Sequence, residues 1–170
     1  MPSNLRLLVR QQMQLYAGEL KLGNKVKILD VGIGGDKIRP SENYQYFPSK
    51  NFKTMDIDIQ WKPDFVADIT ETDFADNYWD LVILSQTLEH IWDFRKAINE
   101  IYRILKIGGY AIIDSPFQYP HHPEENFADY WRFSPQALEK LCQEAGFTTK
   151  CKLIDNLLTI ALCKKEKKSP

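Results

Sequence analysis

The feature that most constrains the fold is a short apolar run that ends in an acid and a cluster of glycines. This run is residues 25–36, Lys-Val-Lys-Ile-Leu-Asp-Val-Gly-Ile-Gly-Gly-Asp. Its near-continuous apolar character is typical of a parallel strand that is buried on both faces. Glycines accept positive φ and leave room for a ligand close to the backbone. Because ligands bind beyond the carboxyl ends of strands in open α/β sheets, the run predicts a strand that opens into a ligand loop.

Two common nucleotide-binding patterns do not fit this glycine loop. The dinucleotide fingerprint requires a third glycine three residues after Gly34, and the residue at that position is Lys37. The chain also has no Gly-Lys-Ser/Thr phosphate loop. Taken alone, the run is as consistent with an ordinary glycine-rich turn as with a ligand site.

The composition describes a globular chain of one domain. Its 170 residues are 44% apolar and 26% charged, which is enough for a full core. The net charge of −1 provides no general attraction to nucleic acid or to an anionic membrane. Because no membrane-spanning run or signal peptide is recognisable, we expect a cytoplasmic protein. Three cysteines lack the spacing of metal ligands and are expected to be reduced thiols: Cys142, Cys151 and Cys163.

Strands and helices alternate along the predicted chain. Helices are expected at 3–22, 93–105 and 134–146, and strands at 26–31, 52–56, 64–69, 79–85, 110–114, 148–153 and 157–163. Pro40 and Pro48 leave room for at most one helical turn between the first two strands. A stop at Gly108-Gly109 is expected to end the second helix. The strand–helix–strand order predicts a right-handed parallel crossover, and the short connection at Asp155-Asn156 predicts an antiparallel final pair.

Acidic residues close the predicted second and third strands. Asp56 is placed to accept hydrogen bonds from the two vicinal hydroxyls of a ribose, with Asp58 as a nearby competitor. Asp68 can accept from the exocyclic amine of adenine, while Ile69 packs on the ring. Taken alone, each acid is also consistent with an ordinary turn.

Together these motifs resemble the class I S-adenosylmethionine-dependent methyltransferases over residues 26 to about 163. The motifs in order are Asp30-x-Gly32-x-Gly34, Asp56, Asp68-Ile69, Trp79-Asp-Leu-Val82, Leu88-Glu-His90 and Leu105-Lys-x-Gly-Gly109. The resemblance implies an α/β, Rossmann-like, doubly wound fold. Its sheet would be mostly parallel and seven-stranded, with the last strand antiparallel and helices on both faces. One domain, 1–170, would comprise an amino-terminal helix (1–22), a core (26–163) and a basic tail (164–170).

Three features depart from the usual pattern of that family. Gly35-Asp36 stands where the family often has x-Gly, no helix follows the glycine loop, and Ile107 replaces the commoner proline. A subset of small bacterial-type members shares the proline-containing loop and an Asp-Tyr-Trp-Arg-Phe segment, here residues 129–133.

The resemblance also implies S-adenosylmethionine as cofactor, together with the residues that would bind it. Gly32 and Gly34, after the motif acid Asp30, would line its methionine part. Lys37 or Arg39 would replace part of the attraction that a helix amino terminus gives to an anionic group. The full set of implied cofactor residues is Asp30, Gly32, Gly34, Lys37, Asp56, Asp68, Ile69, Ser85 and Gln86, with Ser85 and Gln86 beside the reacting methyl group.

The segment 116–133 is the predicted acceptor pocket and lid. A loop of ~18 residues without periodic pattern is usually functional or disordered, and this one has too many aromatic residues for disorder. The alternative is that its last aromatic residues cover the core. Candidate catalytic residues are His90, His121 and Tyr130, with His122 as a further possible base. No metal site is expected from His121 and His122, because neighbouring side chains diverge in an extended chain.

We therefore expect an S-adenosylmethionine-dependent methyltransferase that acts on a small-molecule or saccharide-like acceptor. The chain lacks the motifs for amino-group methylation of adenine or glutamine and for attack on cytosine, and it lacks a basic aromatic face for nucleic acid. A non-catalytic adaptor with a degenerate methyltransferase fold remains the alternative, and a nucleotide-binding oxidoreductase is disfavoured by Lys37. The sequence does not identify the acceptor or the oligomeric state.

Overall fold

The computed structural model describes residues 3–34, 41–122 and 127–167. Its α-helices (α), strands (β) and short 3₁₀ helices (η) follow one another along the chain. They are α1 (Ser3–Leu20), β1 (Lys27–Val31), η1 (Glu42–Gln45), β2 (Asn51–Asp56), η2 (Ile59–Trp61), β3 (Phe65–Val66), β4 (Trp79–Ser85), η3 (Leu88–His90), α2 (Phe94–Ile104), β5 (Leu105–Pro116), α3 (Pro135–Ala145), β6 (Thr148–Ile154) and β7 (Leu158–Lys164).

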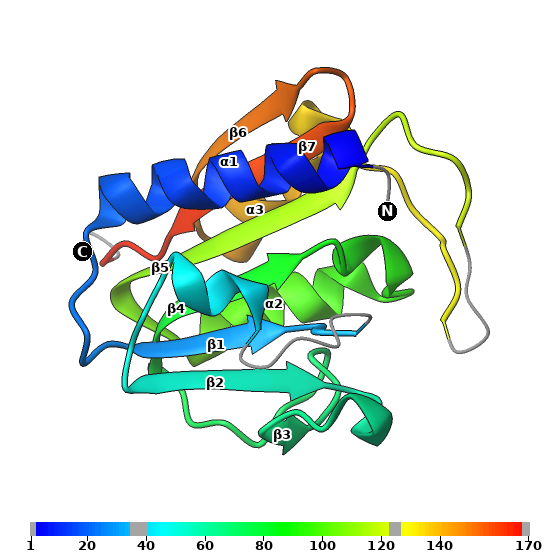
Figure 1. The fold of residues 1–170 in the computed structure, drawn as a ribbon. Coiled ribbons are helices and arrows are strands. Elements are labelled where there is room, and N and C mark those ends of the chain that lie inside the picture. The colour runs from blue at the N-terminus through cyan, green and yellow to red at the C-terminus, as the bar shows by residue number, and fades with distance from the viewer. Residues whose placement is uncertain (1–2, 35–40, 123–126, 168–170) are drawn as a thin grey trace.

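The seven strands form one sheet in the order β3-β2-β1-β4-β5-β7-β6 (Figure 1). All neighbouring strands are parallel except β7, which runs antiparallel to both β5 and β6. The predicted fold class is confirmed, including the antiparallel last strand. The predicted single helical turn between the first two strands is η1.

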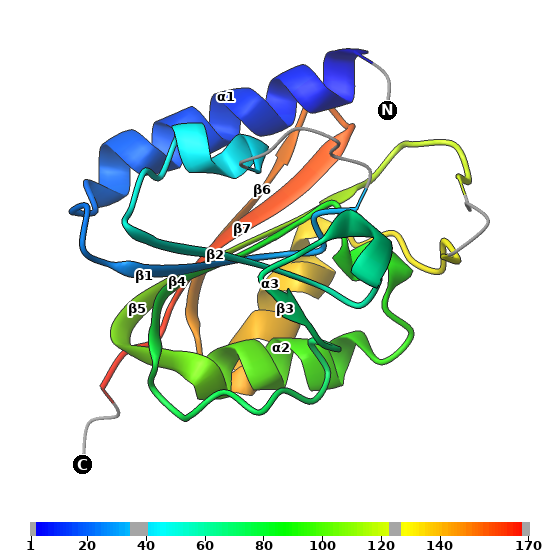
Figure 2. The same ribbon diagram turned by 60° about the horizontal axis from the view of Figure 1, so that its bottom comes forward.

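Helices cover both faces of the sheet (Figure 2). Under α1, Leu5 and Met13 pack with apolar residues of the central strands. On the opposite face, Ile98 of α2 and Leu138 of α3 belong to a larger core. The apolar stripe predicted on residues 3–22 is therefore mainly a core contact.

The helix ends on the second face follow local capping rules. At α2, Asp93 accepts a hydrogen bond from the backbone N–H of Lys96 at 3.1 Å. At α3, Ser134 accepts from the N–H of Ala137 at 3.2 Å, and Gly146 ends the helix with φ of 110°. Both starts and the end at Gly146 agree with the sequence pattern.

The helix α2 ends within one residue of its predicted end, but the predicted glycine stop at Gly108-Gly109 is wrong. The helix ends at Ile104, β5 begins at the next residue, and Gly108 and Gly109 lie inside this strand. A Cβ on Gly109 would lie 2.9 Å from the carbonyl oxygen of Lys106 and 3.0 Å from that of Asp80. Gly109 is therefore required by close backbone approach within the sheet rather than by a helix stop.

The third strand is shorter than the predicted 64–69. A carboxylate oxygen of Asp64 accepts from both the N–H and the hydroxyl of Thr54, at 2.9 Å each. This side chain takes the place of further backbone pairing at the edge of the sheet, so β3 contains only two residues. Asp68 lies beyond its end, where it accepts from the N–H of Thr70 at 2.8 Å.

The basic tail begins later than the sequence suggested. Lys164 is part of β7, and Lys165 is buried. The Lys165 ammonium donates to Asn77 Oδ1 at 2.9 Å and to the carbonyl oxygens of Tyr102 and Leu105 at 2.7 and 2.8 Å. These contacts stabilise the carboxyl end of α2, where a cation is favoured.

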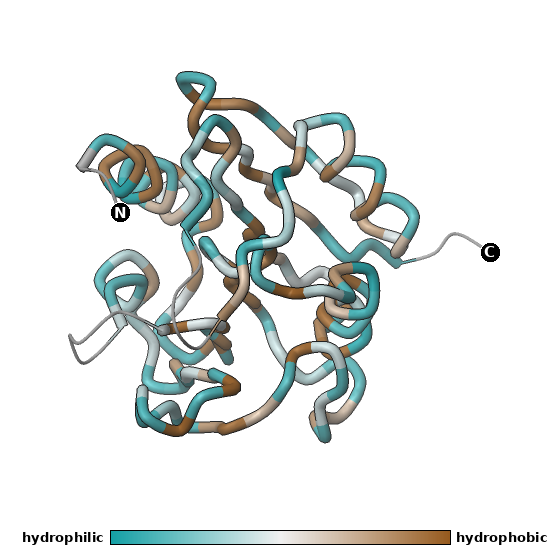
Figure 3. The backbone as a smooth tube through the Cα atoms, turned by 90° about the vertical axis from the view of Figure 1, so that its right-hand side faces the viewer, coloured by the Kyte–Doolittle hydropathy of each residue, from teal (hydrophilic) through white to brown (hydrophobic). Residues whose placement is uncertain are grey.

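The carboxyl ends of the parallel strands β1, β2, β4 and β5 lie along one edge of the sheet. This edge is on the right in Figure 1 and faces the viewer in Figure 3, where hydrophilic and hydrophobic segments mingle on the loops. No helix within the described ranges is both long enough and apolar enough to cross a membrane.

Candidate functional site

Two adjoining cavities lie at this edge. The Asp56 cavity, of about 420 Å³, lies beyond β2 and β3 and includes Asp56, Asp58, Trp61, Asp68, Ile69 and Thr70 in its lining. The His122 cavity, of about 340 Å³, lies beyond β4 and beneath α1 and includes Arg10, Asn43, Ser85, Glu89, Tyr119 and His122. The wall shared by both cavities is formed by Val31, Gly32, Gly34, Gln86, His90 and Phe127.

Glycine is needed at the two positions after β1 for different structural reasons. Gly32 has φ of 74°, and a Cβ there would lie 2.2 Å from the hydroxyl oxygen of Thr87, so no larger residue fits. A Cβ on Gly34 would lie 3.2 Å from Trp61 Nε1 and 3.5 Å from Asp56 Oδ2. Gly34 thus leaves space in front of the Asp56 carboxylate, which a ligand can use.

The motif acid Asp30 holds the turn that follows the glycine loop. It is buried, and it accepts hydrogen bonds from the Ser41 hydroxyl and, at 3.0 Å, from Asn43 Nδ2. Asp30 also lines the His122 cavity. Lys37 and Arg39, the two basic residues expected to attract an anionic group there, lie outside the described residues.

Asp56 has the position expected of a ribose acceptor. It is 7% exposed at the end of β2, and its Oδ1 accepts from the N–H of Asp58 at 2.9 Å. Burial raises the pKa of Asp56, while backbone hydrogen bonds, including that from Gly34, act in the opposite direction. Asp68 and the buried Ile69 line the same cavity, so the structure brings these predicted residues together.

Ser85 and Gln86 lie at the end of β4, as predicted. Gln86 has φ of 50°, an unusual value for a non-glycine residue, and two hydrogen bonds to Asp114 hold it there. Its N–H donates to the Asp114 carbonyl oxygen at 3.1 Å, and its Nε2 donates to Asp114 Oδ1 at 2.6 Å. Asp114 is fully buried, and burial raises its pKa to about 6. No role was predicted for Asp114, which lies inside β5, two residues before its end at Pro116.

Glu89 is the least expected residue of the site. It is fully buried, and neither carboxylate oxygen has a hydrogen-bond partner among the described residues. Burial raises the pKa of Glu89 to about 8. Its Oε1 lies 3.7 Å from Nε2 of His90, whose Nδ1 lies 2.6 Å from the carbonyl oxygen of Ala128. Burial also lowers the pKa of His90, which favours the neutral ring.

The described parts of the segment after β5 contribute both to a cavity lining and to the core. Its first part faces the His122 cavity through Tyr119 and His122. Its last part packs on the protein: Trp131 Nε1 donates to the Ile91 carbonyl oxygen at 3.1 Å, and Phe133 is in the core.

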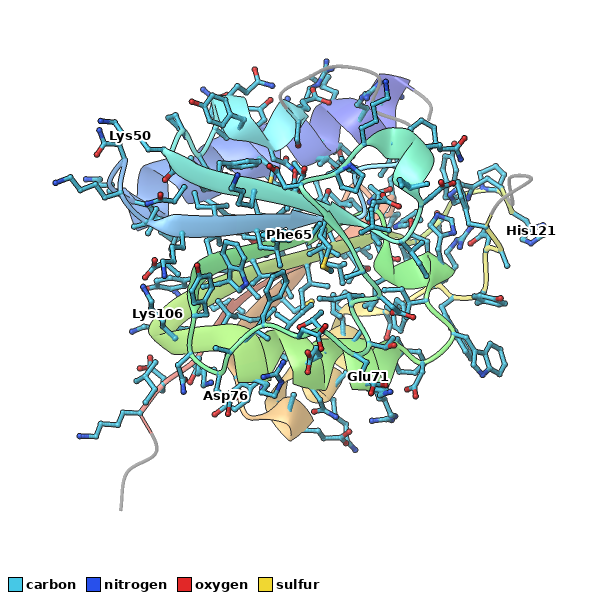
Figure 4. All side chains as sticks on the ribbon, turned by 90° about the horizontal axis from the view of Figure 1, so that it is seen from below. Lys50, Phe65, Glu71, Asp76, Lys106 and His121 are labelled. Carbon is cyan, nitrogen blue, oxygen red and sulfur yellow. The ribbon has the colours of Figure 1, made fainter. Side chains whose placement is uncertain are left out.

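Two predicted catalytic residues lie outside both cavities. His121 is exposed at the outer edge of the molecule (Figure 4). Tyr130 is also exposed, and its ring packs against Trp92 with centroids 5.3 Å apart. Neither residue lines the Asp56 cavity or the His122 cavity, whereas His90 lines both.

Sequence comparison identifies the family. A family model described as a methyltransferase domain matches residues 29–113, half of the chain. The chain belongs to this methyltransferase family. The predicted superfamily is thereby confirmed, as are its enzyme class and S-adenosylmethionine as its cofactor at the level of the family.

Curated relatives of this methyltransferase domain are distant and longer. Phosphoethanolamine N-methyltransferase 3 of Arabidopsis thaliana is 26% identical over 148 residues, 76% of this chain and 30% of that protein. A ubiquinone/menaquinone biosynthesis C-methyltransferase of Psychromonas ingrahamii is 32% identical over 84 residues, 48% of this chain and 33% of that protein. The chain thus spans about a third of the length of these relatives.

Solved structures agree with the family in fold. One of them is a 1,6-didemethyltoxoflavin-N1-methyltransferase from Burkholderia thailandensis with bound 1,6-didemethyltoxoflavin and S-adenosylhomocysteine. It superposes on this chain with a TM-score of 0.65. It is 15% identical, and the match covers 95% of this chain and 81% of the other. At this identity the likeness concerns the fold alone.

Proposed function

We propose that this methyltransferase domain transfers the methyl group of S-adenosylmethionine to a small polar acceptor in the His122 cavity. The observation that carries the proposal is the common wall of the two cavities, which includes Gly32, Gln86 and His90. A cofactor in one cavity and an acceptor in the other would meet at this wall.

The Asp56 cavity suits the adenosine part of the cofactor. The Asp56 carboxylate is available in front of Gly34 to accept from ribose hydroxyls, and Asp68 can accept from the adenine amine. The apolar surface of Ile69 offers a contact for the adenine ring. In this arrangement the methionine end would point past Gly32 towards Gln86.

The His122 cavity suits a small polar acceptor. Its lining is rich in polar groups from α1 and η1, and Glu42 bridges Arg6 and Arg10 of α1. A volume of about 340 Å³ is enough for a molecule of the size of a sugar or an amino alcohol. The two curated relatives are named for phosphoethanolamine and for ubiquinone/menaquinone biosynthesis, and these names also indicate small-molecule acceptors.

Methyl transfer makes limited demands on the protein. The bound cofactor supplies a methyl group on a sulfonium, whose carbon–sulfur bond breaks with its electrons left on sulfur. The protein has to align the acceptor with that carbon and exclude water. An acceptor hydroxyl or ammonium must also lose a proton, and Nε2 of His90 is the available base at the shared wall.

Binding of S-adenosylhomocysteine, measured by titration calorimetry, tests the cofactor site. Asp56→Asn should weaken binding by about 1–3 kcal/mol, because hydrogen bonds to a charged acceptor are lost. The matched control is Asp76→Asn, an exposed acid that lines neither cavity and is labelled in Figure 4, and this variant should bind like the wild type. A flat titration of folded wild-type protein would overturn the proposal and favour a non-catalytic adaptor.

The acceptor class needs a second measurement. Release of S-adenosylhomocysteine from S-adenosylmethionine can be followed with sugars, amino alcohols and phenols as acceptors. Transfer should saturate with a small acceptor and fall when Gln86→Ala alters the shared wall. Saturable transfer only to a protein or nucleic acid would contradict the small-acceptor assignment.

A further inference from the structure

We infer that Glu89, His90 and His122 form a binding site for one divalent metal ion at the inner wall of the His122 cavity. One possible ligand atom from each residue lies within 4.8 Å of the other two. Glu89 and His90 belong to η3, whereas His122 comes from the segment after β5. Adjacent in sequence, His121 and His122 are not expected to share a metal, and the fold instead brings His122 to the Glu89-His90 pair.

The burial of Glu89 and the lack of hydrogen bonds to its carboxylate are an independent reason to place a cation here. A buried carboxylate is costly unless it has hydrogen bonds, a counter-ion or a metal. Glu89 is fully buried, and within the described chain its oxygens accept no hydrogen bond. Its Oε1 lies 3.7 Å from Nε2 of His90, but burial favours the neutral form of this ring, so it does not balance the charge of the carboxylate.

Both histidines are oriented as metal ligands. The Nδ1 of His90 contacts the Ala128 carbonyl oxygen, so this nitrogen carries the proton and Nε2 keeps its lone pair. The Nδ1 of His122 lies 3.0 Å from Asp129 Oδ2 and 3.2 Å from the Pro120 carbonyl oxygen. Metal-binding histidines commonly donate their second N–H to such a carbonyl or carboxylate group.

Arg132 is the neighbouring cation that has to be considered. Its Nη1 and Nη2 donate to the two oxygens of Asp129, and it also donates to carbonyl oxygens of Tyr119 and Trp131. Arg132 therefore neutralises Asp129, and it lies 3.4 Å from Nδ1 of His122, farther than the two acceptors. Glu89 is left without an ion-pair partner of its own.

The ligand set indicates the kind of metal. Two imidazole nitrogens with one carboxylate are typical of zinc and of non-haem iron(II) sites that keep a position open. The open side here faces the cavity lined by Ser85, Gln86 and Tyr119. A divalent ion at this place would take up the lone pair of His90 Nε2, so that His90 would no longer act as the base. The ion itself would then lower the pKa of an acceptor hydroxyl, a consequence that rests on the proposed methyl transfer.

The test is a metal titration of the chelator-treated full chain. Calorimetry with Zn²⁺ and the visible absorption of Co²⁺ should both report one bound ion per chain. His90→Ala, His122→Ala and Glu89→Gln should each weaken binding by at least about 10-fold, the range seen when metal sites lose supporting groups. The matched control is His121→Ala, which removes the adjacent exposed histidine and should retain wild-type affinity.

Two outcomes overturn the metal site: no saturable binding of one ion per chain, or wild-type affinity in both His90→Ala and His122→Ala. Circular dichroism identifies any variant that fails to fold. The metal affinities of the folded variants then decide whether the site exists. Titration of the same samples with S-adenosylhomocysteine separates the two proposals. Metal binding without cofactor binding contradicts only the proposed function, and cofactor binding without metal binding contradicts only the metal site.

Discussion

The buried carboxylate of Glu89 should make the metal-free protein less stable as the pH rises. The pKa of Glu89 is about 8 in the folded protein, compared with 4.5 for a free side chain. A difference of one pKa unit corresponds to about 1.4 kcal/mol, so the full cost is about 5 kcal/mol. This is an upper limit, because entry of water or local opening would reduce it.

The sign follows from proton binding. Between pH 4.5 and about 8 the folded protein keeps the Glu89 proton, while the unfolded chain has lost it. The unfolded state therefore binds fewer protons, and the free energy of unfolding falls as the pH rises through this window. The cost is absent below the unfolded pKa and complete above the folded pKa.

Glu89→Gln removes this titration without removing the side chain. Urea unfolding with chelator present measures the free energy of unfolding of both proteins at about pH 5 and about pH 9. The difference between variant and wild type should shift by about 3–5 kcal/mol in favour of the variant from the lower to the higher pH. The matched control is the exposed Glu71→Gln, whose difference from wild type should change by no more than about 0.5 kcal/mol. If the difference in free energy of unfolding between Glu89→Gln and wild type does not change with pH either, the carboxylate is not desolvated and the prediction is wrong.

Three further predictions concern other parts of the fold. Gly32→Ala should destabilise the protein by about 2–5 kcal/mol, from positive φ and the clash with Thr87, and Thr87→Ala should relieve about 1–3 kcal/mol of this in a double-mutant cycle. Ser134→Ala should cost about 1 kcal/mol in thermal unfolding, because α3 loses its cap. Asp129→Asn should cost about 1–3 kcal/mol at neutral pH. Arg132 holds the pKa of Asp129 well below its usual range, so this cost should begin to decrease in acid unfolding as the pH falls below 3.8, the pKa of a free side chain, and should be lost only in strong acid, at the folded pKa.

Local rules explain what the sequence predicted well. The caps at Asp93 and Ser134 depend on side chains three residues from their partners, so their pattern is readable along the chain. The buried strand β4 also matches its predicted bounds, because an uninterrupted apolar run leaves little choice. Asp56 was placed correctly at the end of β2 by counting along the short strand from the aromatic Phe52.

Contacts between distant residues explain what the sequence did not predict. His122 reaches Glu89 because the N–H groups of Tyr130 and Trp131 donate to the Glu89 carbonyl oxygen, a pairing across some 40 residues. Lys165 stabilises the end of α2 across a similar or larger separation. No local sequence pattern encodes contacts between residues so far apart in the chain. His122 was therefore predicted only as part of a loop and Lys165 as part of a tail.

The common wall of the two cavities has a thermodynamic consequence. A ligand in the Asp56 cavity and a ligand in the His122 cavity both touch Gln86 and His90. Gln86, which Asp114 holds in an unusual backbone conformation, would contact both ligands, so a ligand that moved it would change the surface offered to the other. The two affinities are then coupled, and linkage requires that each ligand change the affinity for the other by the same factor.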